Sequence, residues 1–366
     1  AETRKLLGFS ERYREFINNH LLWMPSVDLL GADGAGDWLS AFRWMLGWTN
    51  LKSFGADMAR GMRHYTGFTI LAALSVLGLV LLRPRARRRS KELSKQIKKI
   101  RTDSFSLTLK AGAFALILIL PVPVALIALG LLVTQSPAPA DHSVAMGVAL
   151  QGTGFWLLLL IGLRQMVRDY GLAREHLGWG QALCDQLNKE LRWLIPPTGL
   201  LSMVVSSAAL GVPNAFIEVS GAGGAPDEFL RLGQVAMAMS MGLLMVMFFR
   251  LFSRKSPVMS GMKSNGQEAR WLQYHVLWFD PLLLVPFGLG VASLAGYFYT
   301  SVFLSGVVFE MVWYLLLLTL AKDLILRGLY VAKRRLQFQE AVKRREEAIA
   351  KREADENPEE EPESEV

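Results

Sequence analysis

Few side chains in this chain have the type and spacing that catalysis or metal binding requires. The five histidines, at positions 20, 64, 142, 176 and 275, are scattered and lack the spacing of metal ligands. No phosphate-binding glycine loop, HExxH motif or serine nucleophile elbow is present. The single cysteine, Cys184, excludes an internal disulfide and a cysteine metal cluster. We therefore expect no enzyme activity, no bound metal and no cofactor.

The residues that could carry function lie inside long apolar segments. Glu310 sits near the middle of the run 302–321, where a carboxylate is unfavourable unless it is protonated or paired. A polar group on a neighbouring helix, such as Gln151 or Thr153, could pair with it. Two roles stay open for Glu310: a structural role in packing, or a role in gating or ion handling.

The preceding apolar run, 276–298, carries prolines and small residues. Asp280 comes early in this run, where it could cap a helix whose first turn begins at Pro281. Pro286 removes a further backbone hydrogen bond and favours a kink. Small residues recur at four-residue spacing from Gly288 to Gly296, a pattern typical of close contact between membrane helices. The candidate residues for gating or packing are Glu310, Asp280, Pro281, Pro286, Gly288 and Gly296.

Seven apolar runs must position these residues. Each is near the roughly 20 residues that a helix needs to cross a hydrocarbon core of about 30 Å. None alternates with period two as a membrane β-strand does, and a helix bonds its own backbone in hydrocarbon. The sequence therefore predicts an all-α integral membrane protein with a seven-transmembrane-helix bundle. The runs are 65–82, 107–133, 144–163, 194–211, 232–249, 276–298 and 302–321.

The basic residues predict the orientation of the bundle. Segments 83–101, 164–192, 250–270 and 322–352 hold 30 of the 40 lysines and arginines, whereas the intervening loops hold only Arg231. Because basic loops stay in the cytoplasm, we expect a periplasmic amino terminus and a cytoplasmic carboxyl terminus. The net charge of +8 is thus a topology signal, and we expect no nucleic-acid partner.

We expect three regions along the chain. Residues 1–64 form an amphipathic periplasmic helical segment that includes an interfacial helix, and residues 65–329 form the seven-helix transmembrane domain. Residues 330–366 form a charged cytoplasmic helix followed by an acidic linker, since 355–366 reads DENPEEEPESEV. This linker, and the absence of a signal peptide before a periplasmic segment, predict that the chain is the middle of a longer protein.

Two groups of residues are candidates for contact with membrane lipids. Trp38, Trp44 and Trp48 belong to a short amphipathic helix before the first run, and such helices often lie in the headgroup layer. Packing of this helix on the outer surface of the bundle is the alternative. The consecutive Arg87, Arg88 and Arg89 follow the first run, where basic residues attract anionic lipid.

Several stretches together resemble one known family. In order and spacing they are similar to the inner-membrane domain of the large mechanosensitive channels of the MscS superfamily, the MscK (KefA) type of Gram-negative bacteria. The resemblance extends over residues 6–348. The stretches are LLWMPSV at 21–27, RWML at 43–46, the loop 83–104, LRWLIPP at 191–197, WFDPLLLVPFGLG at 278–290 and RGLYVAKRRLQFQEAVKRREEA at 327–348.

The resemblance implies a function for the bundle. In that family, extra membrane helices precede a separate three-helix core that holds the pore, and the assembled channel is a homoheptamer in the bacterial inner membrane. The Gly- and Ala-rich pore helix has no counterpart here, so the resemblance implies a non-pore part that senses tension or braces a channel releasing ions and small osmolytes on hypoosmotic shock. The competing hypotheses are a free-standing seven-helix secondary transporter that uses Glu310 as its intramembrane carboxylate, and a membrane enzyme that uses the cytoplasmic loops.

Overall fold

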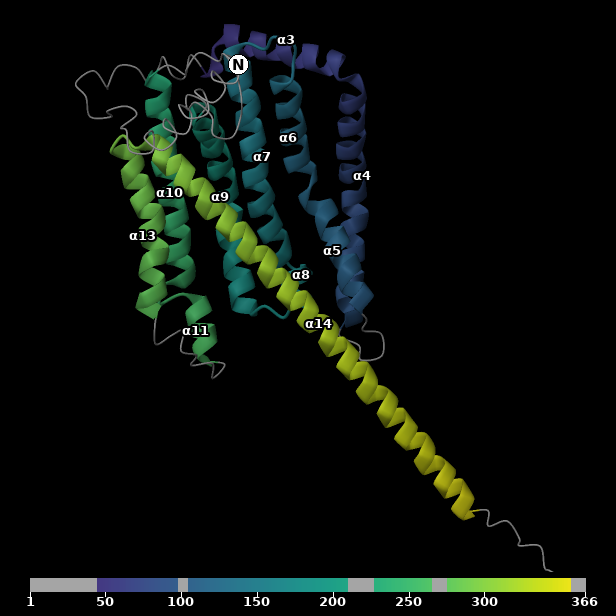
Figure 1. The fold of residues 1–366 in the computed structure, drawn as a ribbon. Coiled ribbons are helices and arrows are strands. Elements are labelled where there is room, and N and C mark those ends of the chain that lie inside the picture. Colours follow the sequence, from purple (N-terminus) through teal and green to yellow (C-terminus); the bar gives the residue numbers. More distant parts are fainter. Residues whose placement is uncertain (1–44, 98–104, 210–226, 265–274, 357–366) are drawn as a thin grey trace, which may run out of the picture.

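The described part of the chain consists mainly of helices. The computed structural model describes residues 45–97, 105–209, 227–264 and 275–356, and no strand occurs among them. Figure 1 shows most of the helices side by side, as a bundle. The helices are α3 (Trp48–His64), α4 (Thr66–Ile97), α5 (Phe105–Ile119), α6 (Pro121–Thr134), α7 (Asp141–Val167), α8 (Leu172–Glu175), α9 (Gln181–Ala208), α10 (Asp227–Phe252), α11 (Pro257–Ser264), α13 (His275–Leu294) and α14 (Phe298–Glu356).

The all-α membrane fold is confirmed. By length and apolar composition, however, fewer than the seven predicted helices qualify as membrane spans. Within the described residues, four helices are long and apolar enough to cross a membrane: Thr66–Lys95, Asp141–Glu175, Phe229–Ser260 and Phe298–Ile349. The pair α5 and α6 makes a fifth if it is one broken span. The count of seven stays a prediction.

The two remaining apolar runs also lie on helices, but their apolar parts are short. In α9, Lys189, Glu190 and Arg192 occupy the first half, so that only the second half is apolar. In α13, the apolar stretch that meets the test is Phe279–Leu294. Helices of this kind reach the hydrocarbon only partly unless neighbouring elements complete the crossing.

The second run forms a bent pair instead of one straight span. Helices α5 and α6 meet at 50° around Leu120. Pro121 and Pro123 follow directly, and each lacks the N–H that would bond to the preceding turn. The backbone bonds from Leu120 to Leu116 and from Val124 to Leu120 persist, at 3.0 and 2.9 Å, so the break is a bend within a continuous path.

Small residues bring α6 and α7 into close contact. A Cβ atom on Gly130 would lie 2.4 Å from the carbonyl oxygen of Gly147, and one on Gly154 would lie 2.6 Å from Ile127. The two backbones therefore touch, which larger residues at these positions would prevent.

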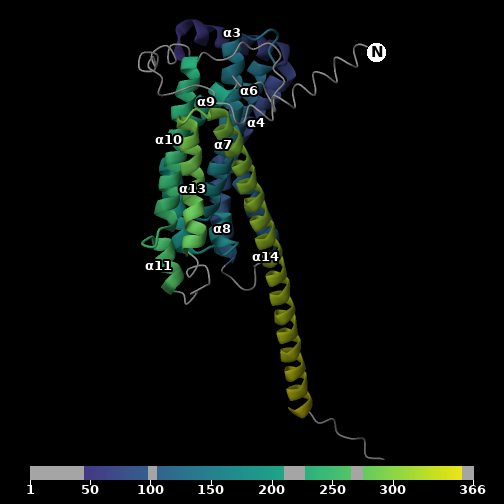
Figure 2. The ribbon, with the colours of Figure 1, turned by 60° about the vertical axis from the view of Figure 1, so that its left-hand side comes forward.

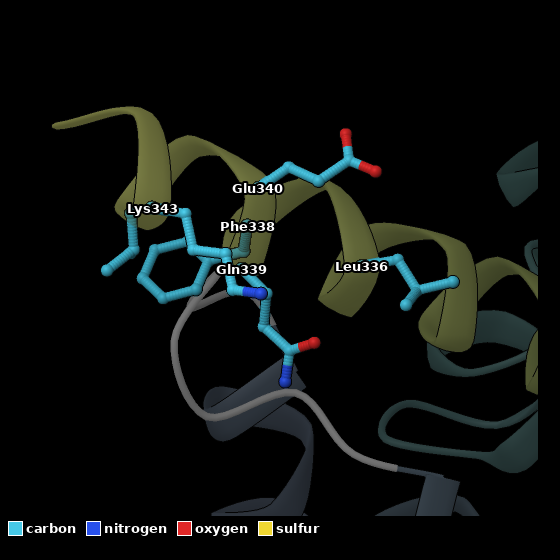
Figure 3. Close-up of a pocket in the computed structure, with 6 residues that line it drawn as sticks. Leu336, Phe338, Gln339, Glu340 and Lys343 are labelled. Carbon is cyan, nitrogen blue, oxygen red and sulfur yellow. The ribbon is translucent and has the colours of Figure 1, made fainter. Parts of the chain in front are cut away.

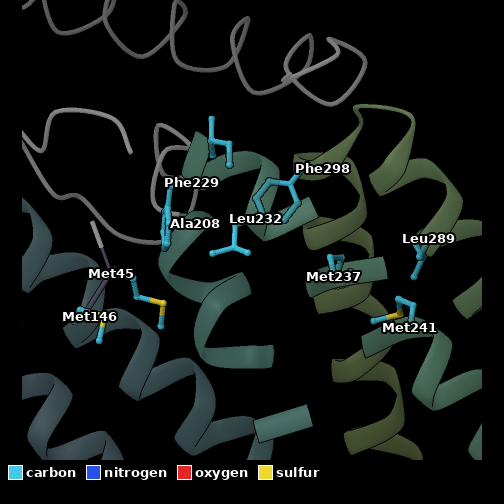
Figure 4. Packing of buried hydrophobic residues seen from close by; sticks show 10 residues of the cluster. Met45, Met146, Ala208, Phe229, Leu232, Met237, Met241, Leu289 and Phe298 are labelled. Atoms are coloured by element: carbon cyan, nitrogen blue, oxygen red, sulfur yellow. The ribbon is translucent and has the colours of Figure 1, made fainter. Parts of the chain in front are cut away.

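Two apolar clusters hold the remaining helices together. The first joins α7, α9, α10, α13 and the start of α14, and Figure 4 shows its side chains converging between the helices. The second joins the other ends of α7, α9 and α10 to α11. The first consists of Met45, Met146, Ala208, Phe229, Leu230, Leu232, Met237, Met241, Leu289 and Phe298. The second consists of Leu160, Val167, Ala173, Cys184, Leu187, Leu191, Leu194, Met247, Leu251 and Val258.

Helices α3 and α14 lie outside this parallel arrangement. Helix α3 runs across one end of the bundle and joins α4 at a corner (Figure 1). Helix α14 starts at the same end, crosses the bundle obliquely and projects well beyond the opposite end (Figure 2). It continues without a break through residues 329 and 330, where the sequence predicted a change from the transmembrane to the cytoplasmic region.

Candidate functional site

A buried carboxylate holds α3 against the hairpin of α6 and α7. Asp57 is fully buried, and its Oδ2 accepts the backbone N–H of Ala140 at 2.9 Å, directly before α7. Arg60 pairs with Asp57 and donates to the carbonyl oxygens of Pro137 and Ala138, at 3.2 and 3.4 Å. We call Asp57, Arg60 and residues 137–140 the α3 clamp.

Two further contacts seat α3 on the same hairpin. A Cβ on Gly61 would lie 2.0 Å from the carbonyl oxygen of Leu132, so α3 and α6 touch through their backbones. At the amino-terminal side of α3, Nε2 of His142 lies 3.2 Å from the carbonyl oxygen of Met45. The close packing at Gly61 and the buried hydrogen bond of His142 together fix α3 to the α6–α7 hairpin.

A second buried carboxylate joins α9 to α10. Glu190 is fully buried and accepts hydrogen bonds from Gln186 Nε2 at 2.9 Å and from Trp193 Nε1 at 2.5 Å. Nε of Arg250, on α10, lies 3.3 Å from Glu190 Oε1, and its guanidinium stands 5.8 Å from the centre of the Trp193 ring. The charge on Glu190 is thus compensated where the two helices meet.

Two aromatic residues attach α14 to the bundle. Trp179, in the turn before α9, donates from Nε1 to Oδ2 of Asp323 at 2.9 Å. Closer to the start of α14, the ring of Phe309 packs on Trp156 of α7 with 5.2 Å between the ring centres. Motion of α14 therefore acts on α7 and on the turn between α8 and α9.

Glu310 lies apart from the polar residues proposed as its partners. It is exposed on α14, and no hydrogen bond or ion pair to it occurs among the described residues. Gln151 instead donates to Thr134 at 3.2 Å, and Thr153 accepts from Ser202 at the same distance. The pairing expected from the sequence is therefore not formed within this chain.

The capping role expected for Asp280 is wrong. Helix α13 begins at His275, so Asp280 and Pro281 lie inside it, both exposed. Pro281 therefore lies in the second turn of α13, where its missing N–H removes one backbone hydrogen bond of the helix. Pro286 is buried within the same helix.

The stripe of small residues in α13 is not a single contact surface within the described chain. A Cβ on Gly288 would meet no atom within 4 Å, and Gly288 is exposed. Gly296 lies beyond the helix end with a φ of 95°, which a glycine adopts easily, and forms the turn to α14. The contact with α10 uses other residues: Gly290, next to Met241, and Ser293, which donates to the carbonyl oxygen of Gln234 at 3.0 Å.

The candidate lipid-contact residues are exposed where the structure describes them. Trp38 and Trp44 lie outside the described residues, whereas Trp48 begins α3 and is 81% exposed. Arg87, Arg88 and Arg89 are exposed on α4, and Arg89 lies 3.4 Å from Glu92. The bundle end with α3 is opposite the end of α4 that carries these arginines (Figure 1).

No metal site is evident in the described part of the chain. It contains no group of three or more His, Cys, Asp or Glu side chains that could hold a metal ion. A hollow beside α14 is lined by residues of that helix alone, including Leu336, Phe338 and Lys343 (Figure 3). Residues of one helix do not enclose a ligand, so this hollow is a surface irregularity and not a binding pocket.

Comparison with known proteins decides the family. The model of the mechanosensitive ion channel inner membrane domain 1 matches residues 66–366, most of the chain. The chain belongs to this family of mechanosensitive channel inner-membrane domains. The match confirms the MscS-type resemblance and does not favour a free-standing transporter. Searches of curated proteins and of solved structures gave no significant match.

For a mechanosensitive channel inner-membrane domain, the informative features are the contacts between helices. The sequence pointed to isolated residues such as Glu310 and missed the two buried carboxylates. Asp57 and Glu190 lie before the apolar runs, among other charged residues, and their partners are 83 and 60 residues away in the chain. A charge on an otherwise apolar helix face was the available signal, as at Glu190, between Leu187 and Leu194.

Proposed function

We propose that this domain is the non-pore, lipid-facing part of a tension-gated channel of the MscK (KefA) type. The domain senses membrane tension or braces the channel, and it has no enzyme activity. A pore elsewhere in the assembly, a homoheptamer, releases ions and small osmolytes after hypoosmotic shock. Family membership supports the channel, and the exposure of α4 and α14 supports the peripheral position.

The observation that carries the proposal is the exposed apolar surface of these two helices. None of the apolar window of α4 or of α14 is buried within the chain. On α4, Leu71, Leu74 and Leu81 are each at least 60% exposed. Apolar surface of this extent is stable next to lipid or against other membrane helices.

Such a surface couples the domain to the bilayer. Stretching thins the bilayer, which changes the match between the hydrocarbon and the apolar length of a helix. Tension shifts the channel equilibrium only if its two conformers differ in area or in lipid contacts. The bent α5–α6 pair and the oblique α14 are the elements whose tilt can supply that difference.

The charge distribution supports an orientation in the bacterial inner membrane. The arginines of α4, together with α8 and α11, lie at the end opposite α3 (Figures 1 and 2). By the excess of basic residues on the cytoplasmic side, α3 is then periplasmic and the free end of α14 cytoplasmic.

The test is patch recording of the full-length channel in membranes that lack other mechanosensitive channels. Replacement of Asp57 by Asn weakens the α3 clamp, and we expect a shifted tension threshold with an unchanged single-channel conductance. Glu92→Gln, a change of an exposed carboxylate on α4, is the control. A changed conductance or ion preference would assign the domain to the pore, and a threshold equal to that of the wild type would remove the sensing role.

A further inference from the structure

The register between α7 and α9 brings three arginines together. Three contacts fix this register: Gly152 with Ser206, Thr153 with Ser202, and Gly199 with Leu157. In all three, residue numbers rise along α7 as they fall along α9, because the helices are antiparallel. Seven residues beyond Leu157, Arg164 therefore lies opposite Arg192, and one turn further Arg168 lies opposite Asn188.

The charges of this cluster confirm that arrangement. Arg168 and Arg192 both lie close enough to Arg164 for their positive charges to repel it. Within the part of the chain that the structure describes, no carboxylate pairs with any of the three. The nearby acids have other partners: Asp169 lies 3.3 Å from Arg174, and Glu190 is bonded to Arg250.

Two polar atoms in the same seam also lack partners. Nε of Arg164 and Oδ1 of Asn188 are both buried, and neither makes a hydrogen bond in the described structure. Buried polar atoms are nearly always bonded, so these two atoms are available to a partner from outside the chain. Since the amide oxygen and nitrogen of Asn188 are interchangeable in assignment, this side chain can present a donor as readily as an acceptor.

The arginine in the neighbouring helix seam has a carboxylate partner. In the neighbouring seam of α9 and α10, Arg250 faces a buried carboxylate, Glu190, at 3.3 Å. In the seam of α7 and α9, Arg164 instead has two further positive charges, Arg168 and Arg192, as neighbours. Three guanidinium groups held together favour an anion with several oxygens, because each planar group can donate two parallel hydrogen bonds.

We propose that Arg164, Arg168, Asn188 and Arg192 form a binding site for a phosphate group, supplied by an anionic lipid headgroup. The apolar run of α7 ends at Leu163, so Arg164 stands where the hydrocarbon gives way to headgroups. Arg168 and Arg192 are exposed, which leaves the site open to lipid. This site is independent of whether the domain senses tension.

The test measures lipid retention by the full chain with native mass spectrometry, using phosphatidylglycerol and, for comparison, phosphatidylcholine. We expect the wild type to retain phosphatidylglycerol preferentially. Arg164→Gln combined with Arg192→Gln should weaken this binding by about fivefold for each arginine removed. The matched control, Arg344→Gln with Arg345→Gln, removes the same charge from the exposed far part of α14 and should have a smaller effect.

Two further measurements make the outcome decisive. Arg168→Gln changes an exposed side chain, so we expect this variant to fold normally. It should lose less lipid binding than the double variant does. Inorganic phosphate in large excess separates the sources: displacement of the lipid assigns the site to soluble phosphate, and no displacement assigns it to the headgroup. Equal retention by wild type, double variant and Arg168→Gln overturns the proposal.

Discussion

At the scale of single residues, the domain depends on two carboxylates that are buried together with their partners. Asp57 and Glu190 each join helices that are distant in sequence. Removing a partner from such a group leaves a buried donor or acceptor unsatisfied, which costs about 1–3 kcal/mol or more. Both are therefore positions where a change of one atom affects the assembly of the bundle.

Asp57→Ala should lower the thermal stability of the purified domain by several degrees. The substitution leaves the N–H of Ala140 and the guanidinium of Arg60 without their acceptor. Thermal unfolding in detergent measures the effect, with the exposed Glu92→Ala as control. Equal melting temperatures for the two variants would show that the clamp contributes nothing to stability.

The pair of Glu190 and Arg250 is suited to a double-mutant cycle. Arg250→Gln should destabilise more than Glu190→Gln, because it leaves the fully buried carboxylate of Glu190 with only the neutral donors of Gln186 and Trp193, whereas the Arg250 side chain is 46% exposed and keeps its contact with water. We expect a coupling energy of about 0.5–3 kcal/mol from unfolding measurements on the four proteins. Additive effects would contradict a direct interaction.

Cys184 should be almost unreactive in the folded domain. Its side chain is fully buried, and burial raises the pKa of the Cys184 thiol, so little thiolate forms near neutral pH. Maleimide labelling should be slow in mild detergent, fast after denaturation, and faster as the pH rises. Rapid labelling of the folded protein at neutral pH would contradict the packing of α9 at its start.

At the scale of elements, the contact of α6 with α7 depends on glycine. Gly130→Ala places a Cβ 2.4 Å from the backbone oxygen of Gly147, which must separate the helices, whereas Gly78→Ala on α4 meets no atom within 4 Å. We expect a clear loss of melting temperature for Gly130→Ala and a neutral or slightly stabilising effect for Gly78→Ala, since alanine favours helix. Size-exclusion profiles and thermal unfolding compare them.

Hydropathy predicted the elements well and their contacts poorly. All seven apolar runs lie mainly on helices, because the length of a run is a local property of the sequence. The start of α13 at His275 and the bend at Leu120 depend on how a helix accommodates proline, which composition does not fix. The clamp between Asp57 and Ala140 requires knowledge of which helix ends meet, and this is set by packing over the whole bundle.

At the scale of the whole molecule, α4 should face lipid in the assembled channel. Cys184→Ala removes the single cysteine of this chain, so that single cysteines can be introduced into it for spin labels. A label at Leu74, 61% exposed, should be accessible to oxygen dissolved in the bilayer, whereas a label at the buried Leu191 should not. Equal shielding at both positions would show that α4 is covered by protein.

The continuity of α14 has a mechanical consequence. Its 59 residues form one helix that is about 90 Å long at 1.5 Å per residue. Because Phe309 and Asp323 attach it to the bundle nearer its start, the remainder works as the long arm of a lever. A rotation of about 5° around these attachments would carry the far tip through several ångströms, so that a slight reorientation in the lipid becomes a large displacement outside it.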